Sequence, residues 1–159
     1  MSLQERSIGL TINGVQRTVS ATASMTLLDM VRTKLELTGS KECCSEGECG
    51  ACTMILDGAP INSCLVLAVE ADGSVVTTVE GLGAGMTHLQ KSFLSEGAVQ
   101  CGFCIPGMVV AATALLESVP QPSESDVREG LSGNLCRCGG YSRICAAVME
   151  AARLGGADA

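Results

Sequence analysis

The stretch CSEGECGAC at residues 44–52 places three cysteines in the spacing C-x4-C-x2-C, and a fourth, Cys64, follows twelve residues after the last of them. Three sulfurs from so short a segment can converge only if the chain wraps tightly without regular structure. Gly47 and Gly50 permit the positive φ angles that such wrapping needs. Neighbouring amides can then point inward and donate to the sulfurs, which spreads their negative charge. The segment therefore predicts a loop wrapped around a metal centre.

The same spacing discriminates between classes of metal site. C-x4-C-x2-C followed by a distant cysteine is the plant-type pattern for a 2Fe–2S cluster held by four thiolates. The alternatives are a zinc knuckle and a pair of disulfides, but zinc sites rarely place x4 and x2 spacings in one glycine-rich loop. We therefore predict a 2Fe–2S cluster at this loop.

Composition narrows the class of protein further. The chain has 159 residues, of which 47% are hydrophobic and 17% charged, so it can form one ordinary domain or two small ones with a real core. Its formal net charge is −7 and it has no run of basic residues, so nucleic acid is not an expected partner. The longest apolar run, residues 108–116, is too short for a membrane span, which needs about 20 residues.

Cysteine usage indicates metal binding rather than disulfides. Residues 1–6 show no secretory signal, which predicts a cytoplasmic protein. Ten cysteines in a cytoplasmic chain indicate metal sites. His88 is the only histidine, which excludes Cys2His2 zinc fingers and Rieske clusters because each of them needs two.

A second set of cysteines lies in the C-terminal half of the chain. Cys101 and Cys104 form a C-x2-C pair, and Cys136 and Cys138 form a C-x-C pair. Each pair precedes a predicted helix, so two helix N-termini can face one anionic centre with their dipoles favouring its charge. These four cysteines predict a second site that holds zinc or iron through thiolates.

Cys43 and Cys145 remain outside both sets. Cys43 adjoins Cys44 and could replace it as a ligand, but the x4 spacing favours Cys44. Cys145 lies among apolar residues of the last predicted helix, and free cysteine is commonly a small buried apolar residue. Both are predicted to be structural.

Hydrophobic periodicity predicts two domains and an α+β fold. Residues 1–79 contain an alternating hairpin around Asn13-Gly14, a helix with apolar positions from Leu27 to Leu35 that stops at Gly39, the cysteine loop, and two further strands. Beyond a glycine-rich connection, residues 80–159 show helical signals only. The expected strands are 53–56 and 75–79, and the expected C-terminal helices are 89–94, 106–117, 125–131 and 141–152. We expect a small mixed sheet crossed by a helix, followed by four helices.

Three motifs resemble those of one known family. They are CSEGECGACT at residues 44–53, QCGFCIPGM at 100–108 and GNLCRCGGY at 133–141. In this order and spacing they are similar to the small iron–sulfur subunit of the molybdenum hydroxylases, the family of xanthine dehydrogenase, aldehyde oxidase and carbon monoxide dehydrogenase. The resemblance covers residues 8–152, which is nearly the whole chain.

This resemblance implies an N-terminal β-grasp ferredoxin-like domain and a C-terminal four-helix bundle domain, each with one 2Fe–2S cluster. It implies that Gln100 hydrogen-bonds the molybdopterin held by a large partner subunit, since a buried glutamine offers the donors and acceptor that a pterin edge requires. It places Cys138 against the amino group of that pterin. The implied ligands are Cys44, Cys49, Cys52 and Cys64 for the outer cluster and Cys101, Cys104, Cys136 and Cys138 for the inner cluster.

The chain departs from the family's pattern at three positions beside these motifs. The family usually has glycine at the position of Cys43, and threonine at the positions of Ile105 and Gly139. None of these departures removes a ligand. Ile105 does remove a hydroxyl donor near the inner cluster, which bears on the reduction potential of that cluster.

Electron transfer within an oxidoreductase is the function that these motifs predict. Substrate would be hydroxylated at molybdenum on the large subunit, and electrons would pass singly through the inner and then the outer cluster. The recipient would be FAD on a medium subunit, a haem protein or another external acceptor. No residue of this chain is predicted to be catalytic. The alternatives are a free ferredoxin-like electron carrier and a zinc-binding interaction module.

Overall fold

The chain begins with the β-hairpin that the alternating pattern predicts. In the computed structural model, which describes residues 5–155, β1 (Glu5–Ile12) pairs antiparallel with β2 (Val15–Thr22). Asn13 and Gly14 join them with φ angles of 51° and 76°, as a two-residue type I′ turn requires. The inward-facing side chains of β1 are buried, so the hairpin forms one wall of the first core.

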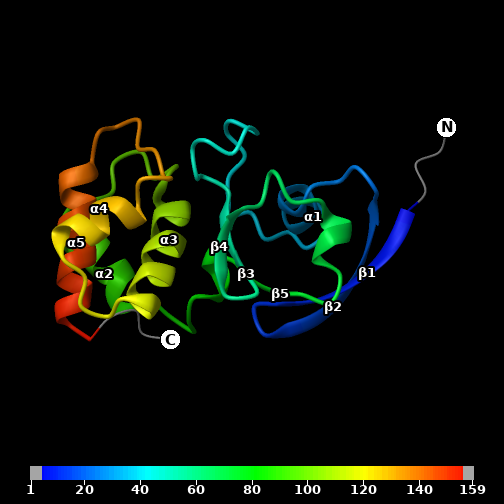
Figure 1. Cartoon of the computed structure of the whole chain (residues 1–159), viewed down its shortest axis with the longest axis horizontal. Helices are drawn as coiled ribbons and strands as arrows, with labels where there is room; N and C mark the ends of the chain where they lie inside the picture. The colour runs from blue at the N-terminus through cyan, green and yellow to red at the C-terminus, as the bar shows by residue number, and fades with distance from the viewer. Residues whose placement is uncertain (1–4, 156–159) are drawn as a thin grey trace.

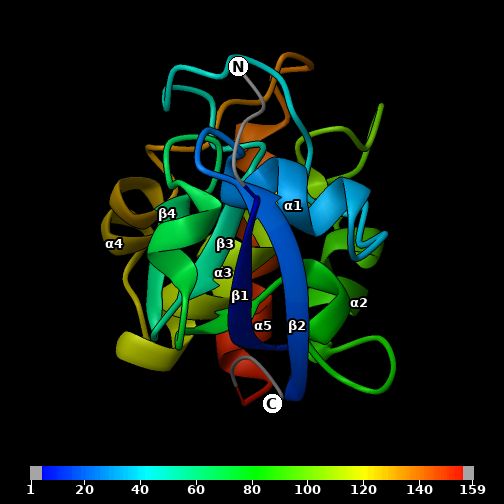
Figure 2. The same cartoon turned by 90° about the vertical axis from the view of Figure 1, so that its right-hand side faces the viewer.

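The hairpin is the outer part of a mixed sheet. Within residues 5–155 this sheet has five strands in the order β2-β1-β5-β3-β4. β5 (Val75–Thr77) runs parallel to β1 and antiparallel to β3 (Thr53–Leu56), and β3 pairs antiparallel with β4 (Ala59–Asn62). Figure 2 looks along the length of the molecule, with β1 and β2 in front. The expected β-grasp type of sheet is therefore present.

Strand β4 is the element that the sequence pattern does not predict. It contains Pro60, which lacks an N–H group and therefore argues against a strand. Because β4 lies at the edge of the sheet and pairs only with β3, proline is tolerated there. The last predicted strand is also shorter than expected, since the 3-10 turn η2 (Val79–Gly81) follows β5.

Helix α1 (Leu27–Thr33) packs its apolar face into the first core and leads into the cysteine loop. The hydroxyl of Thr26 accepts a hydrogen bond from the amide of Asp29 at 3.0 Å, and the Asp29 carboxylate completes a capping box. The helix ends two residues before the predicted Leu35. The left-handed φ of 59° at Glu36 turns the chain there, ahead of Gly39, which was the expected stop.

The C-terminal half consists of the four expected helices: α2 (His88–Ser95), α3 (Ile105–Ser118), α4 (Glu124–Gly130) and α5 (Tyr141–Arg153). Their buried side chains form a second hydrophobic core, separate from that of the sheet. Figure 1 shows the four helices grouped together beside the sheet. A 3-10 turn, η1 (Ala68–Ala71), contributes to the first core. Among residues 5–155, no helix has both the length and the hydrophobicity that a bilayer span requires.

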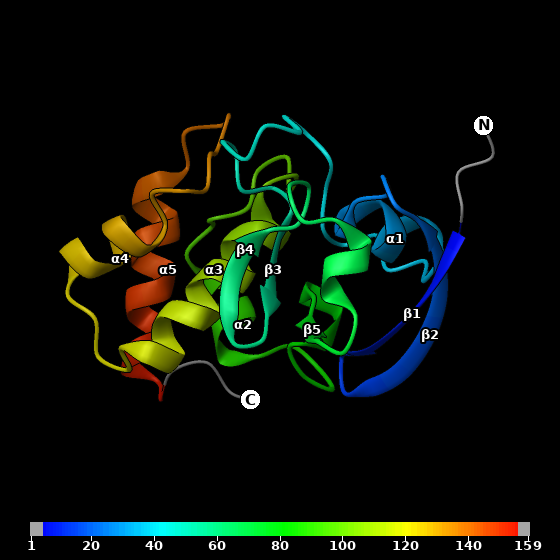
Figure 3. The ribbon, with the colours of Figure 1, turned by 45° about the vertical axis from the view of Figure 1, so that its right-hand side comes forward.

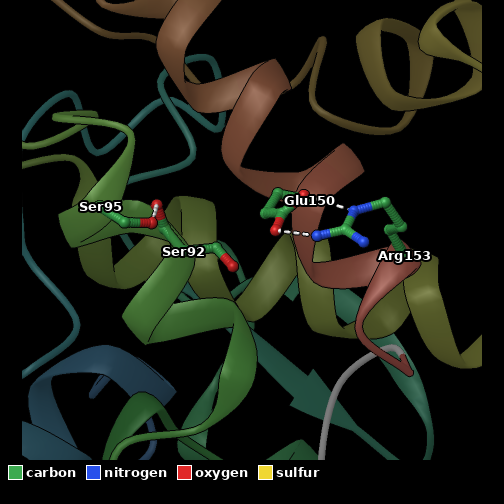
Figure 4. Close-up of polar contacts among 4 residues, drawn as sticks. All are labelled: Ser92, Ser95, Glu150 and Arg153. Carbon is green, nitrogen blue, oxygen red and sulfur yellow. Dashed lines mark hydrogen bonds and ion pairs between the residues drawn. The ribbon is translucent and has the colours of Figure 1, made fainter.

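Helices α2 and α5 pack against each other in the second core. Ser92 on α2 is 2% exposed, and its hydroxyl has no hydrogen-bond partner among the described residues. Figure 4 shows Ser92 on α2 beside α5, where Arg153 binds both oxygens of Glu150 at 2.8 and 2.7 Å. Ser95, one turn further along α2, donates to the carbonyl of Ser92 at 3.2 Å. Each of these hydrogen-bonded contacts lies within a single helix, so the buried apolar side chains hold the two helices together.

Helix α3 joins the two halves, because it packs against β3 and β4 (Figure 1). The crossing point is Gly107, where the backbone of α3 approaches the backbone of the cysteine loop. A Cβ atom built on Gly107 would lie 2.2 Å from the carbonyl oxygen of Gly50. Glycine is therefore required here by the close approach of two backbones.

We expect Gly107→Ala to lower the free energy of unfolding by about 1–3 kcal/mol, because an added methyl group must push the helix away from the loop. In an ordinary helix interior the same change would raise stability by about 1 kcal/mol. Chemical denaturation of the whole chain measures the change in the free energy of unfolding. A loss of stability supports the close contact between α3 and the loop, and a gain contradicts it.

Gly133→Ala is the matched control for this substitution. It adds the same methyl group, but nothing lies within 4 Å of the added atom. We expect its denaturation curve to overlay that of the wild type. A Gly107→Ala protein as stable as the Gly133→Ala protein would show that the two halves do not meet at Gly107.

Candidate metal centres

Both sets of cysteines lie on loops that emerge at the same end of the molecule. Figures 1 and 3 show the loop between α1 and β3 at the top of the view, beside the loops that lead into α3 and α5. Residues that are far apart in the chain are thereby gathered at one end of the structure.

The first set of thiols forms two pairs. The sulfur of Cys52 lies 3.4 Å from that of Cys64. Cys52 directly precedes β3 and Cys64 follows β4, and the antiparallel pairing of these strands brings the two residues together. The thiols of Cys44 and Cys49 interact with each other within the loop. The four cysteines expected from the C-x4-C-x2-C spacing thus lie in one region, as two pairs.

The loop turns its amides toward these sulfurs. Ser45, Gly47 and Gly50 adopt left-handed φ angles of 54°, 81° and 67°, which includes both glycines for which positive φ was predicted. Hydrogen bonds from the amide of Glu46, and next in importance from the thiol of Cys49, lower the pKa of Cys44 to about 6. Since the thiolate is the form that binds metals, this loop is prepared for metal binding.

The more enclosed thiols of the first set behave in the opposite way. Burial, followed by the nearby Cys52, raises the pKa of Cys64 to about 11. Burial also raises the pKa of Cys49. Thiols in such surroundings ionise when a bound metal ion supplies compensating positive charge. The set therefore fits a metal centre better than free thiols.

The second set also forms two pairs. The amide of Phe103, followed by the thiol of Cys138, lowers the pKa of Cys101. Burial, followed by the neighbouring Cys136, raises the pKa of Cys104 to about 12. The structure thus brings together all four residues of the set, from the loops before α3 and α5.

Cys136 shows how the second set accommodates a thiolate. Burial acts to raise the pKa of Cys136, but the amide of Gly140 and the thiol of Cys104 bring it below its ordinary value. The Gly140 nitrogen lies 3.4 Å from the Cys136 sulfur. A backbone amide therefore faces the sulfur at the start of α5.

The first turns of α3 and α5 are free of side-chain caps, unlike those of the other α-helices. Helices α1, α2 and α4 each carry a capping box, whereas Cys104 and Gly140, the N-cap residues of α3 and α5, make no such hydrogen bond. Pro106 stands in the first turn of α3, as predicted. Uncapped N-termini of two long helices favour a negative charge between them. This arrangement supports the expectation that both helices face one anionic centre.

Tyr141 is a residue of this site that the sequence analysis assigned no role. Its hydroxyl accepts a hydrogen bond from the amide of Cys136 at 2.8 Å. The side chain therefore fixes the direction of an amide that belongs to a cysteine of the second set. The signal in the sequence was its position, three residues after Cys138 and at the first position of the last helix.

A cavity of about 370 Å³ connects the two sets of cysteines. The first set contributes Cys49, and the second contributes Cys101, Cys104 and Cys136. Cys43 also lines this cavity, beside these thiols, but it belongs to none of the four pairs. The two predicted sites are thus neighbours.

Exposure distinguishes the remaining candidate residues. Gln100, Cys101 and Cys138 are all exposed in this chain. A pterin-binding glutamine would become buried only against another chain. Cys145 is buried on α5, and burial raises its pKa.

The four thiols of each site lie in two pairs. Two thiol pairs at each site match a 2Fe–2S cluster, which is held by four cysteine thiolates. The thiols, inward amides and uncapped helix ends present in each half therefore fit such a cluster.

Comparison with known proteins agrees with this geometry. The 2Fe-2S iron-sulfur cluster binding domain matches residues 10–78, and the [2Fe-2S] binding domain matches residues 78–149. The nicotinate dehydrogenase small FeS subunit of Eubacterium barkeri is 47% identical over 147 residues, which cover 91% of this chain and 94% of that protein. The chain belongs to the iron–sulfur subunits of the molybdenum hydroxylases.

Solved structures in this family share the whole fold. The structure of quinoline 2-oxidoreductase from Pseudomonas putida 86 matches with a TM-score of 0.89 and 48% identity, over 96% of this chain and 98% of that chain. The aldehyde oxidoreductase from Desulfovibrio desulfuricans ATCC 27774 matches with a TM-score of 0.90 and 41% identity, over 94% of this chain and 17% of that chain. The same fold thus occurs as a separate subunit and as part of a longer chain.

Membership of this family confirms the predicted class of function. The chain is an electron-transfer subunit of an oxidoreductase complex and holds two 2Fe–2S clusters, one for each matching domain. The expected ferredoxin-like domain followed by a helical domain is also confirmed.

Replacing Tyr141 tests how this iron–sulfur subunit controls its second site. We expect Tyr141→Phe to keep both clusters but to change the paramagnetic signal and the reduction potential of the second one only. The physical reason is that the amide of Cys136 loses its acceptor and can turn toward the sulfur. Redox titration followed by electron paramagnetic resonance measures both signals, and an unchanged second signal would contradict this role.

Proposed function

We propose that this chain carries electrons from a molybdopterin site on a large partner subunit, through its inner and outer sites, to an acceptor. The observation that carries the proposal is the pair of four-thiol sets, one in each half of the chain, that border a common cavity. Each cluster, when bound, takes up and releases one electron at a time. Two one-electron sites in series suit the removal of two electrons from a substrate oxidised on another subunit.

The proposal assigns each thiol to one of the two sites. The two pairs of the first set hold the outer cluster, and the two pairs of the second set hold the inner one. The outer ligands are Cys44, Cys49, Cys52 and Cys64, and the inner ligands are Cys101, Cys104, Cys136 and Cys138. Backbone amides and the N-termini of α3 and α5 stabilise the negative charge at these sites.

The inner site is proposed to meet the pterin of the large subunit. Gln100 and Cys138 support this orientation, because both are exposed. Gln100 directly precedes Cys101, and Cys138 is itself an inner thiol that interacts with Cys101. In this proposal the amide of Gln100 hydrogen-bonds the pterin edge and Cys138 lies against its amino group. Phe103, at 46% exposure, adds apolar surface beside them for the contact with the large subunit.

The outer site is proposed to deliver electrons to the acceptor. This acceptor is FAD on a medium subunit or a haem protein, and the loop around the outer thiols presents a negative surface to it. Glu46 and Glu48 are exposed on this loop, where charge complementarity can steer a partner. We propose a cytoplasmic location for the whole complex.

The two sites define two domains in this proposal, with residues 1–79 forming the ferredoxin-like domain and residues 80–159 the helical domain. Core packing supports a boundary there. Val76 belongs to the first core and Leu82 packs against the second, while Val79, the last residue of the first domain, already packs against the second core.

Isolation of the native complex through a tag on this chain tests the proposed function. We expect a large molybdopterin-containing chain to co-purify, together with iron and acid-labile sulfide in equal amounts. A monomer that carries both clusters without a partner would indicate a free electron carrier instead. A colourless protein containing zinc would indicate an interaction module.

Replacement of Cys101 tests the assignment of the inner ligands. We expect Cys101→Ser to abolish the inner paramagnetic signal and to leave the outer one, because only the second set loses a thiolate. Cys145→Ser is the matched control, since Cys145 is a buried thiol that belongs to neither set, and it should retain both signals. Survival of both signals in the Cys101→Ser protein would refute the assignment.

Two neighbouring cysteines provide a test of the outer site. We expect Cys44→Ser to lose the outer signal, because Cys44 pairs with Cys49 and receives the amides of the loop. We expect Cys43→Ser to retain it, since Cys43 is exposed and lies outside the pairs. The opposite result would make Cys43 the ligand.

A further inference from the structure

We propose that Asn134 is a positioning residue for electron transfer within this chain. It holds the two ligand loops in direct backbone contact, so that one hydrogen bond connects the outer site to the inner site. The inference rests on the proposed function, because it assumes that both thiol sets hold clusters and that electrons pass between them.

The connecting bond runs between residues next to the ligands. The amide of Leu135 donates to the carbonyl of Cys49 at 2.9 Å. Cys49 is a thiol of the outer set, and Leu135 is followed directly by Cys136 of the inner set. A path from the sulfur of Cys49 to the sulfur of Cys136 therefore follows covalent bonds and a single hydrogen bond, without a jump through space.

Asn134 forms a second connection, one residue away on each loop. Its Nδ2 donates to the carbonyl of Gly50 at 2.9 Å and to the hydroxyl of Thr53 at 3.2 Å. The residue is 6% exposed, and its own amide donates to the carbonyl of Leu131 at 3.0 Å, at the end of α4. Asn134 thus fixes the outer loop to the helical domain from a rigid position.

The backbones of the two halves approach each other closely at this junction. A Cβ atom built on Gly50 would lie 2.4 Å from the carbonyl oxygen of Gly133 and 2.5 Å from Nδ2 of Asn134. On the side of α3, a Cβ atom built on Gly107 would lie 2.2 Å from the carbonyl oxygen of Gly50. The junction is therefore formed by backbone against backbone, and the bond from Leu135 to Cys49 lies beside it.

The two sets also border a common cavity of about 370 Å³, lined by Cys49 of the outer set and by Cys101, Cys104 and Cys136 of the inner set. Electron tunnelling through bonded atoms and hydrogen bonds is much faster than through a gap of similar length. A single electron that leaves one site reduces the other, and no proton or bond is exchanged.

The side-chain amide of Asn134 is tested with Asn134→Asp and Asn134→Ala in the purified complex. Aspartate keeps the shape but replaces the donor with a carboxylate that faces the Gly50 carbonyl. We expect both variants to keep each cluster's own spectrum. We expect them to lose the spin–spin splitting between the two reduced clusters and to transfer electrons between the sites several-fold more slowly. Low-temperature paramagnetic resonance and rapid-mixing kinetics measure these changes.

Gln121→Glu is the matched control. It makes the same exchange of amide for carboxylate, at a side chain that donates to the carbonyl of Ala152 at 3.0 Å, between segments of the helical domain. A general loss of helical stability would affect this variant as well. We expect its splitting and transfer rate to equal those of the wild type.

The outcomes separate this inference from the proposed function. Wild-type splitting and rate in Asn134 variants that contain both clusters would overturn the role of Asn134 and leave the proposed function intact. A wild-type complex without two cluster signals would overturn the proposed function itself. If neither variant assembles, hydrogen exchange of the wild-type complex decides, since the Leu135 amide should be protected and fast exchange there would overturn the inference.

Discussion

The negative charge of the clustered thiolates is the constraint around which both halves of this chain are built. The chain carries a net charge of −7 and only ten lysines and arginines, so side-chain cations are few. Backbone N–H groups take their place, because they point at the sulfurs without needing a counterion. The amides of Glu46 and Phe103 do so in loops, and that of Gly140 does so at the start of α5. The uncapped N-termini of α3 and α5 also present free amides that can stabilise this negative charge.

This constraint explains why the two sites lie so close together. Glycines at 50 and 107 let the backbone of the cysteine loop and that of α3 touch. The contact joins the sheet domain to the helical domain at the point where each holds its thiols. In an electron-transfer subunit, a rigid and short connection between the centres has a direct functional value, whereas a flexible linker would vary their separation.

In the proposed function, the exposed surfaces near the thiols are where the subunit meets its partners. Relatives with this fold carry names that refer to nicotinate, quinoline and aldehydes, so the same module serves complexes named for different substrates. That is the expected behaviour of a chain on which electron transfer is separate from substrate chemistry. Ile105, in the first turn of α3, is a local departure from the family's pattern beside the second site.

Cysteine spacing was enough to predict the loop around the first site, because ligands eight residues apart are constrained by the chain itself. Periodicity and turn residues likewise predicted the hairpin and the four C-terminal helices, since these elements depend on local contacts. The edge strand with Pro60 and the role of Asn134 escaped prediction. Asn134 and Gly50 are 84 residues apart, and their hydrogen bond exists only after α3 has packed on the sheet. No local pattern encodes such a contact, because its partners are chosen by the packing of the two domains.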